Sequence, residues 1–193
     1  MRIQVLWNSK LDIRATFFKY NVTINHQIVN FQIMNYQGTL EEDSEILSLL
    51  TRVFVEEGYT NKSRAKIIFA PDEVRKRGDI ILAKSPTGKL LGMIILARST
   101  SPACQVAKVD EAEIQLLSVY PEARGQGIAS CLIMACERQA MSLGYSKMVL
   151  STQQIMKEAH HVYEQLGYHK NSLRDWSMGI DRSFFVYEKS LTS

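Results

Sequence analysis

One stretch decides the fold: Leu116-Leu117-Ser118-Val119-Tyr120-Pro121-Glu122-Ala123-Arg124-Gly125-Gln126-Gly127-Ile128-Ala129. An apolar strand ends at Val119, and Pro121 cannot continue it. A short loop with two glycines then leads directly into a helix that starts at Gly127. The first N–H groups of a helix lack partners and its dipole favours anions, so this arrangement predicts a phosphate-binding loop. Glycine lets the backbone come close to a phosphate, and Arg124 adds a positive charge.

Two well-known phosphate loops do not fit this stretch. A Walker A loop needs Lys-Ser or Lys-Thr after its last glycine, and neither follows Gly127. A dinucleotide-binding loop needs a third glycine where Ser130 stands, and no acidic residue is clear on the next strand, in residues 146–151. The structural alternative is a tight turn that needs two glycines, but it does not account for Arg124 or for the strand that Pro121 ends.

The flanking sequence alternates strands and helices. Thr39 and Glu42 form a capping box that opens an amphipathic helix, and Gly58 ends it. The apolar run 90–96 lacks alternation, so both of its faces are expected to be buried. Strands are expected at 28–36, 79–84, 89–98, 111–119, 147–151 and 183–189, and further helices at 127–143 and 157–166. This order predicts one α/β (α+β) domain with a mixed sheet and packed helices.

Three motifs in the correct order resemble the GNAT superfamily of acyl-CoA-dependent N-acyltransferases. Residues 124–129 match its Gln/Arg-x-x-Gly-x-Gly/Ala signature. Residues 113–121 look like its central strand, and residues 159–168 look like its last helix, A-x-x-L-Y-E-x-L-G-F. The resemblance implies a GNAT-like central mixed sheet that splays between the fourth and fifth core strands, with helices on both faces. It also implies an acyltransferase that uses acetyl-CoA as co-substrate.

The resemblance further implies a coenzyme A site. Pantetheine would bond to the backbone of Leu117, Ser118 and Val119, although core packing of the Leu117 and Val119 side chains is also expected. The pyrophosphate would bind the N–H groups of Arg124, Gly125, Gln126, Gly127, Ile128 and Ala129, with the hydroxyl of Ser130 beside them. Many members carry an asparagine where this chain has Met156, so Gln153 or Gln154 would have to replace that amide contact, or the contact is missing.

Two residues are candidates for catalysis. Strand alternation predicts that Glu113, Gln115, Leu117 and Val119 point the same way. The resemblance implies Glu113 as general base, acting directly or through water; the equal alternative is a solvated charge at the end of the strand. It implies Tyr163 as the acid that protonates the departing sulfur, against the alternative of a core aromatic residue. His160 and His161 are expected on the surface.

Composition excludes several other classes. A net charge of +3 over 193 residues argues against a dense basic face for nucleic acid. Three cysteines without a C-x-x-C pair, and no H-E-x-x-H motif, indicate neither a disulfide framework nor a metal site. No apolar run could span a membrane, and charges near the N-terminus argue against a signal peptide, so we expect a cytoplasmic protein.

The sequence thus predicts an N-acetyltransferase domain over residues 28–193 that moves an acetyl group from acetyl-CoA to a primary amine by direct attack. The alternative is a non-catalytic acyl-CoA sensor. Residues 1–27 form an extension: an extra hairpin, an arm that contacts a partner and could support a homodimer, or a leader. Acceptor specificity is expected from 56–78, 99–109 and 171–182. In the last of these, Asp175 and Trp176 are expected to line the acceptor site, with Trp176 covering the core as the alternative. Small amines, amino acids, peptide N-termini and lysine side chains all stay open as acceptors.

Overall fold

A computed structural model describes residues 4–5, 17–24, 27–179 and 182–191, with side chains from Asn30 onward. The strands are β1 (Gln4–Val5), β2 (Phe17–Ile24), β3 (Gln27–Asn35), β4 (Asp79–Lys84), β5 (Leu90–Arg98), β6 (Glu111–Val119), β7 (Lys147–Gln153), β8 (His169–Lys170), β9 (Trp176–Ser177) and β10 (Ser183–Ser190). The helices are α1 (Leu40–Leu50), α2 (Lys62–Ile68), α3 (Pro71–Arg75), α4 (Ile128–Ser142) and α5 (Lys157–Gln165). Single turns complete the chain: η1 (Thr51–Val55), which prolongs α1 as a π-helix, η2 (Pro121–Ala123) and η3 (Ser172–Arg174).

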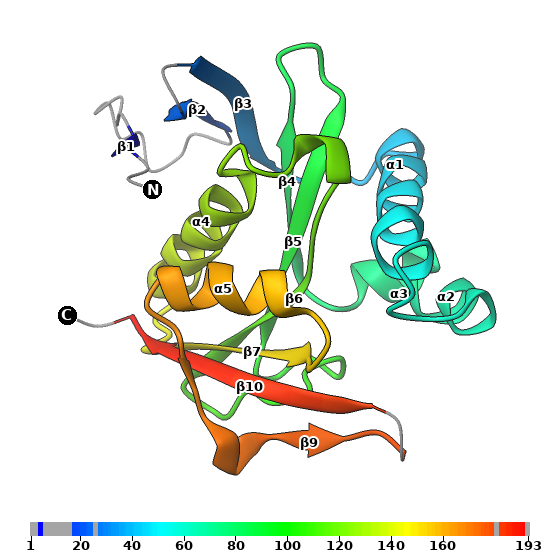
Figure 1. Cartoon of the computed structure of the whole chain (residues 1–193), viewed down its shortest axis with the longest axis vertical. Helices are drawn as coiled ribbons and strands as arrows, with labels where there is room; N and C mark the ends of the chain where they lie inside the picture. Colours follow the sequence, from blue (N-terminus) through cyan, green and yellow to red (C-terminus); the bar gives the residue numbers. More distant parts are fainter. Residues whose placement is uncertain (1–3, 6–16, 25–26, 180–181, 192–193) are drawn as a thin grey trace.

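The strands form one mixed sheet in the order β1-β2-β3-β4-β5-β6-β7-β10-β8, with β9 paired to β10 (Figure 1). Among the described strands, only β6 and β7 run parallel. Their pairing extends from Glu111 opposite Lys147 to Ile114 opposite Leu150 and then stops. The second halves of both strands therefore diverge, as predicted for the fourth and fifth core strands.

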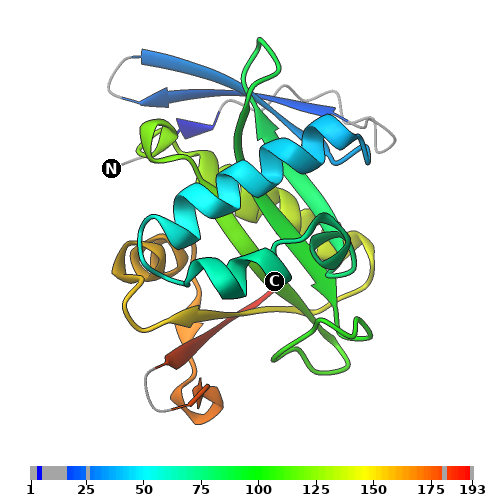
Figure 2. The ribbon, with the colours of Figure 1, turned by 90° about the vertical axis from the view of Figure 1, so that its right-hand side faces the viewer.

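Helices cover both faces of this sheet, with α1, α2 and α3 on one side and α4 and α5 on the other (Figures 1 and 2). Alternate residues of β4 feed two cores: Ile81 packs toward α4, and Ile80 and Leu82 pack toward α1. In β5, Ile94 belongs to the first core and Ile95 to the second. The apolar run 90–96, which lacks alternation, is therefore buried on both faces, as the sequence predicts.

The N-terminal segment extends the sheet at its edge. Strand β2 pairs antiparallel with β3 from Phe17 opposite Met34 to Ile24 opposite Gln27, and β1 adds a short pairing to β2. Among the three alternatives given for residues 1–27, this pairing corresponds to the extra hairpin. The remaining residues of that range, 1–3, 6–16 and 25–26, lie outside the described structure, and the domain boundary at residue 28 stays a prediction. None of the described helices has the length and apolar character needed to cross a bilayer.

Candidate functional site

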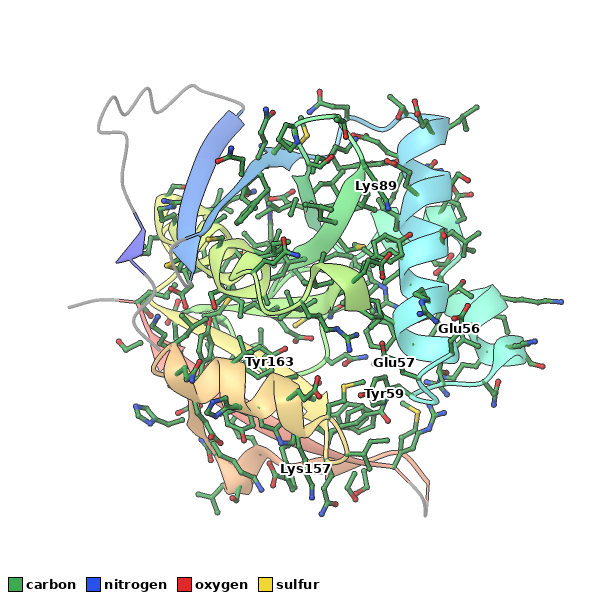
Figure 3. The ribbon with its side chains drawn as sticks, turned by 45° about the horizontal axis from the view of Figure 1, so that its top comes forward. Glu56, Glu57, Tyr59, Lys89, Lys157 and Tyr163 are labelled. Atoms are coloured by element: carbon green, nitrogen blue, oxygen red, sulfur yellow. The ribbon has the colours of Figure 1, made fainter. Side chains whose placement is uncertain are left out.

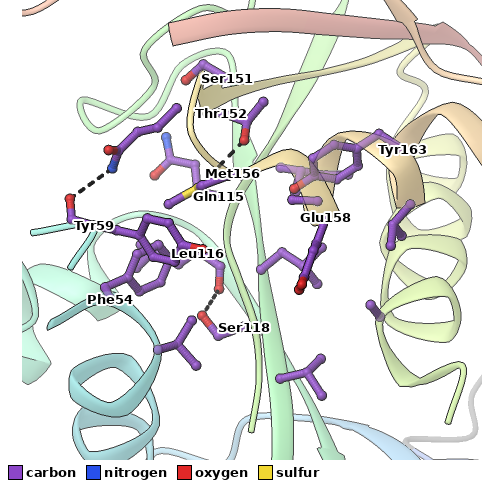
Figure 4. A pocket seen from close by; sticks show the side chains of 18 of the residues that line it. Phe54, Tyr59, Gln115, Leu116, Ser118, Ser151, Thr152, Met156, Glu158 and Tyr163 are labelled. Carbon is purple, nitrogen blue, oxygen red and sulfur yellow. Dashed lines mark hydrogen bonds between the residues drawn. The ribbon is translucent and has the colours of Figure 1, made fainter. Parts of the chain in front are cut away.

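A cavity of about 550 Å³ lies where β6 and β7 separate. Its walls come from β6, β7, the start of α4, α5, the η1–α2 region and the β9–β10 hairpin. Figure 4 shows Gln115, Leu116 and Ser118 of β6 on one side of this space and Tyr163 of α5 on the other. A concave site of this size that joins apolar walls to a few polar groups is typical of a ligand site.

Strand β6 carries a bulge in the middle of the cavity wall. Gln115 pairs with Ile95 and Ser118 with Met93, so Leu116 and Leu117 together oppose the single residue Ile94. Leu116 has a φ of 49°, which is rare for a residue with a side chain and stores backbone strain. Strain of this kind concentrates at functional sites, and here it lies on the wall of the cavity.

The bulge corrects the prediction that Glu113, Gln115, Leu117 and Val119 all face one way. Gln115 and Ser118 lie on the same face, opposite Ile95 and Met93. Leu117 and Val119 instead join the core under α4. An extra residue shifts the alternation by one, so every later side chain changes face. The backbone from Gln115 to Val119 has no partner strand on the β7 side, and Leu117 and Val119 also pack in the core.

The glycine loop has the geometry of an anion site. Gly125 and Gly127 both have a φ of 73°, a left-handed conformation that favours glycine, and Gly127 is the N-cap of α4. The first helical bond runs from the Cys131 N–H to the Gly127 carbonyl (3.0 Å). The N–H groups of Ile128, Ala129 and Ser130 therefore lack helical acceptors and point out of the helix end.

The contacts of Arg124 differ from those predicted for it. Its N–H donates to the Pro121 carbonyl (3.2 Å), so this group is already used, and among the described residues the donors of the loop without an acceptor begin at Gly125. Its guanidinium pairs with Glu57 (2.6 Å) and lies 4.0 Å from Glu158. Sequence reasoning missed Glu57, because nothing in the segment after α1 marks it. Figure 3 shows Glu57 and Tyr59 at the end of the α1–η1 helix, on the side that faces α5.

Glu113 lies on the cavity wall, but its side chain is 0% exposed. One carboxylate oxygen accepts the N–H groups of Gln105 (2.9 Å), Val106 (2.7 Å) and Ala107 (3.1 Å), and the Cys104 thiol approaches it at 3.3 Å. The other oxygen accepts Gln115 Nε2 (2.7 Å). The alternative of a solvated charge is wrong, because the side chain is fully buried and both carboxylate oxygens already accept hydrogen bonds.

The same loop is fixed from its other side. Arg174 donates to the Val106 carbonyl and makes two bonds to Glu111 (3.0 and 2.7 Å). Burial raises the pKa of Glu111, but the bonds from Arg174 and from the Lys108 N–H outweigh it, and the pKa is lowered overall. The 104–107 segment is thus held between the buried Glu113, which binds its N–H groups, and the half-buried Arg174, which binds its carbonyl.

Tyr163 lies on the cavity wall and is 6% exposed. Its ring packs beside Tyr168 and Tyr187, each with its centroid 6.0 Å away. Within the described part of the chain, no hydrogen bond to its hydroxyl is found. Burial raises the pKa of this phenol, so it keeps its proton at neutral pH. Figure 4 shows the side chain reaching from α5 toward the cavity, as a proton donor there would.

The remaining candidates divide between wall and surface. Gln153 lines the cavity, as does Met156, but the Gln153 amide already donates to the Tyr59 carbonyl (3.1 Å); Gln154 is not part of the wall. His160 is half-buried, with its ring against Phe185 and its Nε2 3.1 Å from the Gln153 carbonyl, so it is less exposed than a surface residue was expected to be. His161 is exposed.

All three segments expected to set acceptor specificity reach the cavity. From 171–182 come Trp176, which stacks on Phe184 at 4.2 Å, Met178 and Arg182. Gln105 comes from 99–109, and the longest contribution comes from 56–78: Glu57, Tyr59, Thr60, Arg64, Ile68, Phe69 and Arg77. Asp175 is not on the wall; its carboxylate accepts the Val186 N–H (2.9 Å). Arg77 had no recognisable signal, since it is one of three consecutive basic residues, 75–77, and nothing in the sequence separates it from the other two.

A sheet that splays over a cavity, with a glycine loop and a helix N-terminus at its rim, defines a GNAT-like fold. The sequence model of the Acetyltransferase (GNAT) family matches residues 44–168, well over half of the chain. The chain belongs to the GNAT acetyltransferase family.

Curated relatives match a short part of the chain. Human N-acetyltransferase 8B is 44% identical over 62 residues, which are 31% of this chain and 27% of the relative. The uncharacterized N-acetyltransferase YjgM of Escherichia coli K12 is 36% identical over 59 residues, which are 31% of this chain and 35% of the relative. The matches thus span between about a quarter and little more than a third of these relatives.

Solved structures match almost the whole fold. A GNAT-family acetyltransferase from Staphylococcus aureus Mu50 has a TM-score of 0.66 at 15% identity, covering 84% of this chain and 99% of that one. An aminoglycoside 6'-N-acetyltransferase complexed with coenzyme A has a TM-score of 0.63 at 16% identity, covering 83% and 97%. PaiA N-acetyltransferase from Thermoplasma acidophilum, also in complex with coenzyme A, has a TM-score of 0.63 at 16% identity, covering 82% and 98%. At these identities the likeness establishes the fold alone.

Proposed function

We propose that this chain is an N-acetyltransferase that moves the acetyl group of acetyl-CoA to a primary amine by direct attack. One observation carries the proposal: the backbone of β6 from Gln115 to Val119, which has no partner strand on the β7 side, leads into the N–H groups of the Gly125–Ser130 loop, for which no hydrogen bond is found in the described structure. The first part offers hydrogen bonds to an amide-bearing arm, and the second offers donors to phosphates. Both lie along one cavity, which also contains Tyr163.

The chain's own residues supply three functions. The loop from Gly125 to Ser130 anchors the anionic end of the acetyl donor, whose thioester is the reactive group. The strained backbone at Leu116 and Leu117 presents main-chain groups to the reacting carbonyl, where preorganised dipoles stabilise developing negative charge. Tyr163, protonated and without a competing partner among the described residues, donates a proton to the departing thiolate.

The role of Glu113 as general base, acting directly or through water, stays a prediction, and the full burial of its side chain favours transfer through water. A direct base must approach the amine within hydrogen-bond distance, and this carboxylate is covered by the 104–107 backbone. This burial is also the observation that favours the second candidate function, a non-catalytic acyl-CoA-binding module, because such a module needs no base.

One experiment separates these functions. The protein is incubated with acetyl-CoA and a broad panel of amines, and free thiol is followed with a chromogenic disulfide. We expect acceptor-dependent thiol release, lowered in Tyr163→Phe. Coenzyme A binding by calorimetry without thiol release from any amine would select the non-catalytic module. Absence of both binding and release would refute the two candidates together.

A further inference from the structure

The charged side chains on the cavity wall are unevenly paired. On the α4 side, Arg124 is matched by Glu57 and Glu158. Away from α4, three arginines line the wall: Arg64 of α2, Arg77 between α3 and β4, and Arg182 before β10. Within the described part of the chain, none of these three forms an ion pair. Glu113 also lies on this wall and its charge acts on Arg77, although no ion pair joins it to any of the three arginines in the described structure. The cavity therefore has one end where the arginine is in ion pairs and another where three arginines are not.

Arg77 is the innermost of these cations. One terminal nitrogen donates to Gln115 Oε1 (3.0 Å) and the other approaches the Ile68 carbonyl at 3.4 Å. Its Nε is buried and has no acceptor in the described structure. Burial lowers its pKa, while the charges of Glu73 and Glu113 act in the opposite direction. A guanidinium has five N–H donors, and a desolvated one without a carboxylate partner is costly.

The surroundings of Arg77 fit an apolar ligand with an anionic group. The same wall contains the aromatic side chains Phe54, Phe69, Trp176 and Phe184. Two further polar atoms on cavity-lining residues, Thr60 Oγ1 and Trp176 Nε1, are buried without a hydrogen-bond partner among the described residues.

The other two arginines, Arg64 and Arg182, lie where the cavity meets a second hollow. Arg64 and Arg182 also line a second, more open hollow between α2 and the β9–β10 turn, together with Asn61 and Met178. This hollow adjoins the cavity, because Arg64, Met178 and Arg182 line both. A basic mouth attracts anions and repels polyamines and other cationic acceptors.

We propose that the acceptor amine belongs to a molecule that carries a carboxylate and an apolar side chain, as an aromatic α-amino acid does. This inference rests on the proposed function. Arg77 binds the carboxylate inside the cavity, where the planar fork of a guanidinium matches a carboxylate in two parallel bonds. Arg64 and Arg182 guide the acceptor to the mouth, and the aromatic wall receives the side chain.

Three matched acceptors test this: L-phenylalanine, L-phenylalaninamide and phenethylamine, each assayed for thiol release at saturating acetyl-CoA. The amines differ in basicity, so the measure is the change in kcat/KM between wild type and variant for each. Arg77→Gln should lower kcat/KM for L-phenylalanine by on the order of 10- to 100-fold, the value of a hydrogen bond to a charged group. It should change the values for the two carboxylate-free amines little. Arg77→Lys, which keeps the charge without the fork, should fall between.

Arg98→Gln is the matched control, because Arg98 is half exposed, pairs with Asp79 (3.1 Å) and is not part of the cavity wall. Equal losses for all three acceptors in Arg77→Gln would overturn the inference, since a folding defect acts on every acceptor alike. An unchanged kcat/KM for L-phenylalanine in Arg77→Gln would also overturn the inference.

A binding measurement keeps the inference separate from the proposed function. L-Phenylalanine and phenethylamine are titrated by calorimetry into the protein saturated with coenzyme A. We expect tighter binding of L-phenylalanine, lost in Arg77→Gln. If no amine is acetylated but this preference holds, the proposed function fails and the inference stands; equal binding of the two ligands overturns the inference.

Discussion

Replacing Glu113 by glutamine should destabilise the 104–107 segment before it affects any chemistry. The substitution keeps the size of the side chain and removes its charge. In the structure, one carboxylate oxygen accepts three backbone N–H groups and the other accepts the Gln115 amide. Glutamine has a single acceptor oxygen, so one of these two sets must face an NH₂ group instead.

The magnitude follows from these bonds. If the new oxygen keeps the three N–H groups, three charge-assisted bonds become neutral ones, and the Gln115 amide faces another donor. Charge-assisted bonds contribute about 1.5–3 kcal/mol and neutral ones about 0.5–1.5 kcal/mol, while removal of a buried charge offsets part of the loss. We expect a net loss of about 2–4 kcal/mol in the free energy of unfolding. For a domain of this size that lowers Tm by roughly 4–16 °C.

Thermal unfolding and amide exchange measure this effect. Glu113→Gln should lower Tm by that amount, and exchange at the Gln105, Val106 and Ala107 amides should accelerate. Glu41→Gln, an exposed position in the first turn of α1, is the control and should change stability by less than about 0.5 kcal/mol. Unchanged Tm and exchange would refute the anchoring role. An unchanged Tm, together with a lower kcat and the loss of the acidic limb from the pH profile of kcat, would instead support Glu113 as the base.

Three further substitutions probe the site and its frame. Tyr163→Phe should lower kcat by roughly 10²–10⁴-fold at unchanged coenzyme A affinity, since only the hydroxyl is lost; an unchanged kcat would exclude the acid role. Gly127→Ala puts a side chain at a φ of 73° at a cost of about 1–2 kcal/mol and should weaken coenzyme A binding in calorimetry. Gly144→Ala, at a φ of 87° beyond the far end of α4, should cost similar stability without that loss. For Arg174→Gln, the lowered pKa of Glu111 sets the sign: its contribution is present above the unfolded pKa of about 4.3 and is lost as pH falls through the folded pKa. The Tm gap to wild type should thus be large at pH 7 and shrink below about pH 4, and a gap independent of pH would contradict it.

Local signals in the sequence explain which parts of the fold were predictable. Thr39 accepts the Glu42 N–H (3.1 Å), as the capping box predicts, and β6 has the predicted bounds. Helix α2 was missed, because Ala65 is its one buried residue and its sequence has no apolar stripe. The bulge at Leu116 was missed as well, because a leucine in an apolar run gives no warning of a positive φ.

The candidate site was predictable only where backbone chemistry determines it. Glycines at 125 and 127 announce a left-handed loop, because few other residues adopt that conformation. The surroundings of Glu113 depend on where a loop six to nine residues earlier in the chain folds back, and the position of Arg77 depends on the packing of α3 against the sheet. Such contacts are set by tertiary structure, so the side chains around the acceptor could be assigned to segments but not to roles.

The contacts of Glu113 and Arg77 meet at Gln115, and this connects the acceptor site to the loop at 104–107. Gln115 Nε2 donates to Glu113 and to the Ala103 carbonyl (2.8 Å), while its Oε1 accepts from Arg77. The amide therefore cannot turn without breaking bonds on both sides, and it fixes the orientation of the guanidinium. Gln115 also directly precedes the strained residue of the bulge. A change in the 104–107 loop should for this reason alter both the carboxylate recognition proposed for Arg77 and the backbone proposed to face the thioester, so we expect acceptor choice and turnover to change together through a single buried side chain.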